Sequence, residues 1–488
     1  MTPLDPSLLF RHCDPALLDF ATTAELPETA DGFGQARAEE AVRFAIAMRR
    51  PGYNLFVLGE PGCGRHSTVR RLLEERASGE TVPSDWCYVN NFDDPQRPRA
   101  LKLPAGRGAR FMRDMQQFVG ELGTAITSAF DSDEHRSRLE AIQSAFKSRE
   151  ETALNELNEE SRRHGIALLR TPHGFVFAPV KADEPMNPDQ FNQLPEDEQK
   201  RITLAVEEFG EKLTRLLHQF PRWRREMQAQ VRQASRDSMA LAVGHMIEEL
   251  KERYTDLPEV VAFLEAVQKD VVEAGEELRE SQRSEGDATT VTMTGAISLQ
   301  RYQVNLLVDN GATAAAPIVF EDNPNYQNLV GRVDQVAHMG TLVSNFTLIR
   351  AGALHRANGG YLMIDAVALL SQPYAYDGLK RILKAGQIRI ESLGQMIGLI
   401  STLSIEPEPI PLDLKVVVVG EPRLYYLLRE LDPEFEELFK VGADFESDVE
   451  RSEDNTRLYG LLVGRLARSN RLRPFERGAV ARIIEHAA

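Results

Sequence analysis

The residues best suited to chemistry in this chain form a glycine-rich turn directly after an apolar run. The run covers residues 55–58, and the turn reads Gly59, Glu60, Pro61, Gly62, Cys63, Gly64, Arg65, His66 and Ser67. Glycines let the backbone turn sharply and direct several N–H groups at one anion, and a following helix adds the positive end of its dipole. The segment therefore predicts a strand, a phosphate-binding loop and a helix.

Two positions depart from the phosphate-loop pattern G-x-x-x-x-G-K-[ST]. Arg65 stands where the pattern has the lysine that contacts the phosphates, and His66 stands where it has the hydroxyl that contacts Mg²⁺. A turn of this composition also occurs as a simple connection between a strand and a helix that binds no ligand. The loop therefore predicts nucleotide binding only in the right surroundings, and it leaves hydrolysis open.

Two further apolar runs supply those surroundings. Residues 359–366 form a run that ends in Asp365, as does a strand whose carboxylate holds Mg²⁺ beside a nucleotide. Residues 414–420 form a second run rich in valine. Parallel strands that are buried on both faces are expected to look like this. The three runs together predict one parallel sheet with its phosphate-side residues at the carboxyl ends of the strands.

Composition excludes several classes of protein. The 488 residues include 57 Lys and Arg against 74 Asp and Glu, a net charge of −17, which argues against a general nucleic-acid binder. Three cysteines are too few for a disulfide framework or a zinc site. The chain lacks an apolar stretch long enough to span a membrane and begins without a secretion signal. We expect a cytoplasmic protein without a membrane or nucleic-acid partner.

The spacing of these runs predicts an insertion. Arg65 and Asp365 lie much further apart than two crossover units require, and the chain between them is polar, charged and helical with heptad spacing of apolar residues. These helices either pack on one another or form a substrate-contacting arm. The predicted parts are an N-terminal arm laid on the domain that follows (1–30), the first part of the sheet domain (31–109), an inserted helical domain (110–288), the second part of the sheet domain (289–446) and a partial helical lid (447–488).

With these landmarks in place, the chain resembles the ATPase region of the Lon-like proteases, and most of all the bacterial Lon-related group with a long helical insertion, which includes LonC. The resemblance is carried by residues 34–37, 52–62, 85–92, 321–332, 351–365, 409–420 and 432–445. It implies an α/β fold: a P-loop AAA+ core, with a parallel sheet and flanking helices, interrupted by the helical insertion and followed by a partial helical lid.

The resemblance also implies a site for ATP and Mg²⁺. Gly34 and Gln35 correspond to residues near the adenine, residues 59–67 to the phosphate loop, and Asp365 to the metal-holding carboxylate. The glutamate that polarises water in active relatives corresponds to Ala366, and Glu421 replaces a polar sensor residue. Lys440 lies where related hexamers present an arginine finger to the neighbouring subunit, and a lysine lacks the bidentate fork of arginine.

These departures predict weak nucleotide binding with slow or absent turnover. The alternative is neutral drift in a working ATPase, with Glu421 supplying the missing carboxylate. Leu329, Val330 and Gly331 lie where AAA+ rings place a substrate-gripping pore loop, although a hydrophobic turn packed on the core would look the same.

The family's partners complete the expectation. They are further copies of the chain in a hexameric ring, unfolded or damaged polypeptides, and a Lon-type protease domain in cis or in trans. No segment of this chain resembles the nucleophile segment of the Ser–Lys dyad, so the chain carries only the ATPase-like part of a serine endopeptidase and is either a fragment or a protein that has lost its protease half. Three functions remain open: an ATP-driven module that feeds polypeptide to a proteolytic chamber, a silent scaffold that gates an ATP-independent peptidase, and a stand-alone remodelling module.

Overall fold

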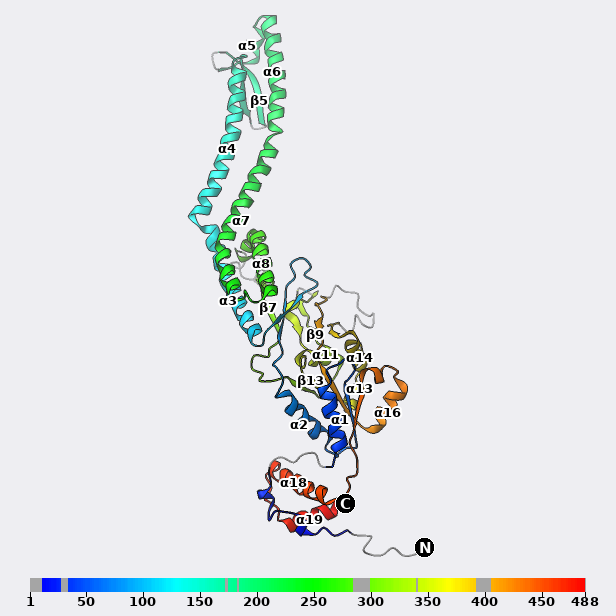
Figure 1. Ribbon diagram of the computed structural model, residues 1–488. Coiled ribbons are helices and arrows are strands. Elements are labelled where there is room, and N and C mark those ends of the chain that lie inside the picture. Colours follow the sequence, from blue (N-terminus) through cyan, green and yellow to red (C-terminus); the bar gives the residue numbers. More distant parts are fainter. Residues whose placement is uncertain are drawn as a thin grey trace. The chain divides into compact units, whose positions relative to one another are not determined.

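The computed structural model describes residues 11–27, 34–171, 174–181, 184–283, 299–338, 341–391 and 405–487. It divides into two compact units, drawn as ribbons in Figure 1: Met1–Arg113 with Gln303–Ala488, and Asp114–Tyr302. Both ends of the predicted arm, 1–10 and 28–30, and the predicted insertion boundary at 288 lie outside the described residues. No helix in the described ranges is both long and apolar enough to cross a membrane.

A five-stranded parallel sheet forms the centre of the first unit, and the predicted α/β fold class is confirmed. Its order is β17-β1-β16-β13-β8, so strands distant in sequence pair directly. The three apolar runs that the sequence singled out are its three inner strands. The strand bounds are β1 (Leu55–Leu58), β8 (Ile318–Glu321), β13 (Tyr361–Asp365), β16 (Lys415–Gly420) and β17 (Val441–Asp444).

Alternate residues of these strands face two separate apolar clusters, because successive side chains of a strand point to opposite faces. Phe56, Leu362 and Val418 belong to one cluster, while Leu55, Met363 and Val417 belong to the other. Both faces are covered, which explains the continuous Val, Ile and Leu in the strands.

Helices from different parts of the sequence cover the two faces. One cluster includes α1 (Ala36–Ala47) and α2 (Arg65–Ala77). The other receives α11 (Tyr326–Val330), α12 (Ala353–Arg356), α13 (Ala366–Leu370), α14 (Ala375–Ala385), α16 (Pro422–Leu431) and α17 (Phe435–Leu438).

Three further strands form a second, smaller sheet. β2 (Asp85–Val89) pairs antiparallel with both β3 (Arg99–Leu103) and β7 (Val304–Val308) in a separate three-stranded sheet. The predicted second part of the sheet domain (289–446) therefore contributes strands to both sheets. Three smaller antiparallel pairs are described: β9 (Arg332–Val333) with β12 (Ile349–Arg350), β10 (Val336–His338) with β11 (Thr341–Val343), and β14 (Gln387–Ile388) with β15 (Ile410–Pro411). The short 3-10 helix η5 (Phe346–Leu348) precedes β12.

The second unit is built from long helices with a small β-hairpin at one end (Figure 1). The hairpin strands β4 (Ile166–Thr171) and β5 (Gly174–Lys181) pack on α4 (Asp133–Arg162) and α6 (Glu196–Leu217). The heptad positions Phe209 and Leu213 are buried there. The elements are α3 (Arg107–Asp131), which begins in the first unit, α4 (Asp133–Arg162), β4 (Ile166–Thr171), β5 (Gly174–Lys181), β6 (Glu184–Pro185), α5 (Pro188–Asn192), α6 (Glu196–Leu217), α7 (Phe220–Arg253), α8 (Pro258–Glu273) and α9 (Gly275–Arg283).

The described part of the predicted arm, residues 11–27, packs on two helices near the C-terminus, whereas the prediction laid the arm on the domain that follows it. Residues 11–27, with the short 3-10 helices η2 (Pro15–Leu17) and η3 (Thr23–Glu25), pack on α18 (Glu453–Ser469) and α19 (Arg477–His486) near the C-terminus. Leu18 is buried with Val480 in one apolar cluster. Arg468 donates to the carbonyls of Thr23, Leu26 and Pro27 at 3.0, 3.0 and 2.8 Å.

Candidate functional site

The glycine-rich turn connects β1 to α2, as predicted, and its geometry requires glycine. Gly62 and Gly64 have φ of 91° and 81°, in the left-handed region that side chains avoid. A Cβ on Gly59 would lie 2.9 Å from both Cys63 Sγ and Phe445 Cβ, so that position has no room for a side chain. A Cβ on Gly62 would meet nothing within 4 Å, so the turn is open on that side.

The N-terminus of α2 has no side-chain cap. Gly64 is the N-cap residue and cannot accept a hydrogen bond through a side chain, and the first turn contains no acidic residue. The first N–H groups of a helix need an acceptor, and their dipoles favour an anion. Arg65 is the first residue of α2 and is only 8% exposed, and none of the described groups hydrogen-bonds its buried Nη1 atom. A bound phosphate would satisfy both features.

Asp365 lies at the same edge of the sheet as this loop. β1 and β13 both pair with β16, with Leu58 opposite Gly420 and Asp365 opposite Val419. Two strand spacings separate Leu58 from Asp365, or roughly 10 Å. The electrostatics agree: burial and Arg65 lower the pKa of His66, while the carboxylate of Asp365 acts to raise it. Residues 59–65 and Asp365 therefore converge although they are distant in sequence.

The neighbouring positions lack the catalytic carboxylate. Ala366 is fully buried in the apolar cluster that contains Phe56, and a Cβ on Gly420 would lie 2.7 Å from Ala366 Cβ. Glu421 is exposed and is the N-cap residue of α16, although its side chain makes no capping hydrogen bond. Asp365 also serves a structural purpose, because its Oδ1 accepts from the N–H of Ala368 at 2.9 Å and caps α13.

Gln35, just before α1, is hydrogen-bonded to the backbone of Glu446, just after β17. Its Nε2 donates to the carbonyl of Glu446 at 2.9 Å, and its Oε1 accepts from the N–H of Glu446 at 3.0 Å. Gly34 has φ of 65°, and a Cβ there would lie 2.3 Å from Val449 Cγ1. The predicted adenine contacts therefore lie where the chain leaves β17, but the amide of Gln35 is already paired.

Lys440 lies at the opposite edge of the sheet from the phosphate loop. It precedes β17, its N–H donates to the carbonyl of Gly52 at 3.1 Å, and its Nζ lies 5.2 Å from the centre of the Tyr53 ring. Because β1 and β17 are parallel, with Leu55 opposite Val441, Lys440 takes no part in the loop pocket of its own chain. The prediction that it binds nucleotide is restricted to the pocket of a neighbouring copy.

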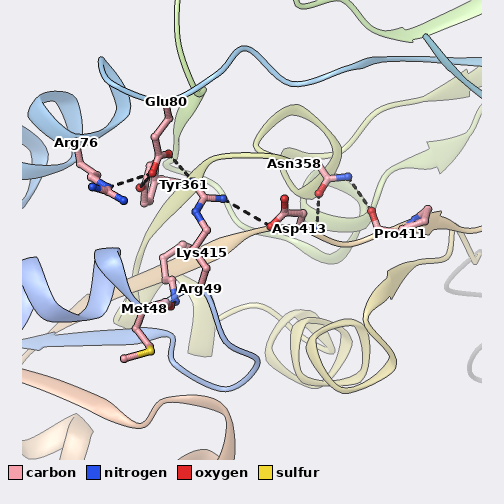
Figure 2. A network of polar contacts seen from close by, with 9 residues as sticks. All are labelled: Met48, Arg49, Arg76, Glu80, Asn358, Tyr361, Pro411, Asp413 and Lys415. Carbon is pink, nitrogen blue, oxygen red and sulfur yellow. Dashed lines mark hydrogen bonds and ion pairs between the residues drawn. The ribbon is translucent and has the colours of Figure 1, made fainter. Parts of the chain in front are cut away.

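A polar network at this amino edge escaped sequence reasoning (Figure 2). Lys415 Nζ donates to the carbonyls of Met48 and Tyr53 at 2.7 and 2.6 Å. Arg49 pairs with Glu80 at 2.6 Å. Burial lowers the pKa of Lys415 to about 8, and Arg49 contributes in the same direction. In the sequence, Lys415 stands directly before a run of valines. The run predicts a strand, but the sequence does not show which groups the lysine contacts.

The predicted pore-loop residues are core residues. Leu329 and Val330 end the short helix α11, which packs against α12 and α14, and both are fully buried. Gly331 has φ of 95°, and a Cβ there would lie 2.6 Å from the carbonyl oxygen of Arg350. The hydrophobic turn is therefore the correct alternative, and the pore-loop assignment is wrong. The exposed apolar side chains nearby are Val336 and Val343 of the β10–β11 pair, at 49% and 43%.

Two known protein families match parts of this chain. Residues 314–446, from before β8 to after β17, match the family "LonB-like, AAA domain", and residues 85–118 match "Lon-like LonC helical domain". The chain carries a Lon-like AAA domain. The second match covers β2, β3 and the start of α3, which leads into the second unit.

Individual relatives align with this chain over short stretches. A putative Lon protease homolog of Escherichia coli K12 is 29% identical over 102 residues, 21% of this chain and 17% of the relative. Archaeal Lon proteases of Thermoplasma volcanium and Thermoplasma acidophilum are each 30% identical over 83 residues, 17% of this chain and 12% of each relative. The alignments thus span less than a fifth of these relatives.

One solved structure shows only distant similarity. NtrX from Brucella abortus aligns with a TM-score of 0.24 and 15% identity over 49% of this chain and 67% of that chain. Similarity at this level supports no conclusion about fold or function.

Proposed function

We propose that this chain is the nucleotide-binding AAA module of a Lon-like ATP-dependent serine endopeptidase. In the cytoplasm it would assemble as a homo-hexameric ring, engage unfolded or damaged polypeptides and deliver them to a Lon-type protease domain. The observation that carries the proposal is the meeting of the Gly59–Arg65 loop and Asp365 at one sheet edge, with Arg65 Nη1 buried and without a hydrogen-bond partner among the described groups.

Turnover in this module is slow or absent. Ala366 replaces the carboxylate that would orient water, and the loss of such a group costs roughly 10²- to 10⁴-fold in rate. Glu421 is exposed at the start of α16 rather than enclosed beside Asp365, which weakens it as a substitute.

The β10–β11 pair is the better candidate for contact with polypeptide. Val336 and Val343 lie opposite one another on neighbouring strands and are both about half exposed. Apolar side chains make contacts that tolerate many sequences, as a protein that handles unfolded chains requires. Polypeptide contact is thereby assigned to these two valines and not to Leu329 or Val330.

A silent ring scaffold that gates an ATP-independent peptidase is the second candidate function. The burial of Ala366 favours it, because the catalytic carboxylate is replaced by a side chain packed into the core. Lys440 favours it as well, since it lacks the bidentate fork of an arginine finger.

Isothermal titration of the chain with ATP, beside a steady-state ATPase assay, tests the proposal. We expect binding by the wild type and roughly 10- to 100-fold weaker binding by Arg65→Ala, because a hydrogen bond to a charged group contributes about 1.5–3 kcal/mol. Arg70→Ala is the matched control: it removes the same charge from the same helix, at an exposed residue paired with Glu74. Binding that Arg65→Ala leaves unchanged would contradict the proposed site. Mg²⁺-dependent turnover well above background would exclude the scaffold.

A further inference from the structure

We propose that the loop pocket binds a nucleoside diphosphate without Mg²⁺, in preference to the Mg²⁺ complex of a triphosphate. This inference rests on the proposed nucleotide binding and specifies its ligand. It follows from an asymmetry in the pocket: the groups that hold the inner phosphates are intact, whereas those that hold the metal and the terminal phosphate are replaced.

The groups that would hold the inner phosphates are present. Gly62 and Gly64 adopt the left-handed backbone of a phosphate loop, and the N-terminus of α2 has neither a side-chain cap nor an acidic residue in its first turn. Arg65 brings a guanidinium that can pair with two phosphate oxygens and carries its charge without a metal ion. Its buried Nη1, unpartnered among the described residues, marks the place of an anion.

The residues present do not fit Mg²⁺. This ion demands octahedral oxygen ligands, and His66 offers imidazole nitrogen where the loop pattern has a hydroxyl. Ser67 lies one residue beyond the position of that hydroxyl, and its Oγ donates to the carbonyl of Gly64 at 2.9 Å. One oxygen of Asp365 is already engaged by the N–H of Ala368.

Without the ion, a third phosphate meets unfavourable charge. In phosphate-loop proteins the metal bridges the last two phosphates and neutralises them beside the carboxylate that ends this strand. Here the carboxylate of Asp365 remains while the metal-binding hydroxyl does not, and Glu421 adds a second acid at the same sheet edge. A diphosphate ends within reach of Arg65 and avoids this repulsion.

Four titrations of the full chain test the inference: ADP and ATP, each with Mg²⁺ or with EDTA. We expect the Kd for ADP to change by less than about threefold when EDTA replaces Mg²⁺, and ATP in EDTA to bind at least about tenfold more weakly than ADP. Tighter binding of Mg²⁺·ATP than of ADP, or loss of ADP binding in EDTA, would overturn the inference and leave the proposed function standing. No binding by either nucleotide under any condition would overturn both.

His66 provides a gain-of-function test. The variant His66→Thr returns a hydroxyl to the metal position, so Mg²⁺ should then tighten ATP binding by about tenfold or more. His66→Ala is the matched control, because it removes the imidazole without adding an oxygen and should gain no metal dependence. Both variants change an exposed side chain, so the fold is expected to tolerate them. Equal Mg²⁺ dependence in all three proteins would refute the role of His66.

Discussion

Ala366 is the residue that most limits chemistry at this site. Its side chain is buried against Phe56 and Gly420, in the apolar cluster under the sheet. A carboxylate introduced here would be buried without a partner, which costs several kcal/mol. We therefore predict that Ala366→Glu lowers the free energy of unfolding by about 3 kcal/mol or more and restores no ATP turnover, as measured by urea denaturation and a phosphate-release assay.

Val367→Glu is the control for this prediction. The next residue along the chain is 53% exposed, so the same new charge should change stability by less than about 0.5 kcal/mol. If Ala366→Glu were as stable as the wild type and hydrolysed ATP, the account of this position would be wrong.

Lys415 predicts a particular dependence of stability on pH. Its pKa is about 8 in the fold against an ordinary value of 10.5. Between these two values the unfolded chain holds the proton and the folded chain releases it, so this group makes the fold more stable as pH rises. The shift corresponds to about 3 kcal/mol gained from pH 8 to above pH 10.5.

Comparison with Lys415→Met separates the contribution of Lys415 to the free energy of unfolding from the contributions of other groups that titrate at high pH. At pH 7 the variant leaves the carbonyls of Met48 and Tyr53 without their donor. The stability of the wild type relative to the variant should increase between pH 8 and pH 10 in urea denaturation. A constant or decreasing difference would show that Lys415 does not titrate in this range.

Individual residues show what a sequence can and cannot predict. The turn after β1 and the carboxylate at the end of β13 could be predicted from the local sequence alone. The signals are glycines at a set spacing and an acidic residue at the end of an apolar run. Leu329 and Val330 are buried because α11 packs on α12 and α14, which lie further along the chain. The local sequence by itself is equally compatible with an exposed loop. The contacts of Lys415 and the paired amide of Gln35 also depend on distant backbone.

Among the elements, the N-terminal segment was assigned to the wrong neighbour. Its prolines predict an extended conformation, but nothing in the local pattern indicates that the partners are α18 and α19 near the other end of the chain. The inner strands were predictable for the opposite reason. Burial on both faces leaves a continuous apolar run that is visible without knowledge of the partner strand.

Arg468 tests the attachment of this segment. Since its guanidinium donates to the carbonyls of Thr23, Leu26 and Pro27, Arg468→Ala should release residues 11–27 and expose Leu18 to protease. We expect thermolysin to cleave within this segment several-fold faster than in the wild type, since local opening controls cleavage. Arg465→Ala, at an exposed position on the same helix, is the control. Equal rates for all three proteins would contradict the attachment.

At the scale of the whole molecule, the helical unit interrupts the sequence of the first unit, which is formed by Met1–Arg113 and Gln303–Ala488. The chain enters and leaves the first unit at adjacent points: a Cβ on Gly108 would lie 2.9 Å from Leu306 Cδ1. Asp85 holds this junction, accepting from the N–H groups of Gly108 and Asn310 at 2.8 Å each.

Replacement of residues 114–302 by a short Gly/Ser linker should therefore preserve the first unit, because short loops cost little to close. We expect the shortened chain to unfold cooperatively and to bind ADP within about threefold of the full chain. Circular dichroism and titration with ADP would measure both properties. Loss of cooperative unfolding would mean that the two units depend on each other for stability.

The account as a whole requires that one pocket be formed by the Gly59–Arg65 loop and the strand that ends in Asp365. A crystal structure of the chain with ADP, grown in EDTA, tests this most directly. We predict the diphosphate inside the loop, with a phosphate oxygen within hydrogen-bond distance of Arg65 Nη1 and of N–H groups in the first turn of α2. A nucleotide bound elsewhere, or an ordered loop whose cavity is closed by its own side chains, would contradict the account.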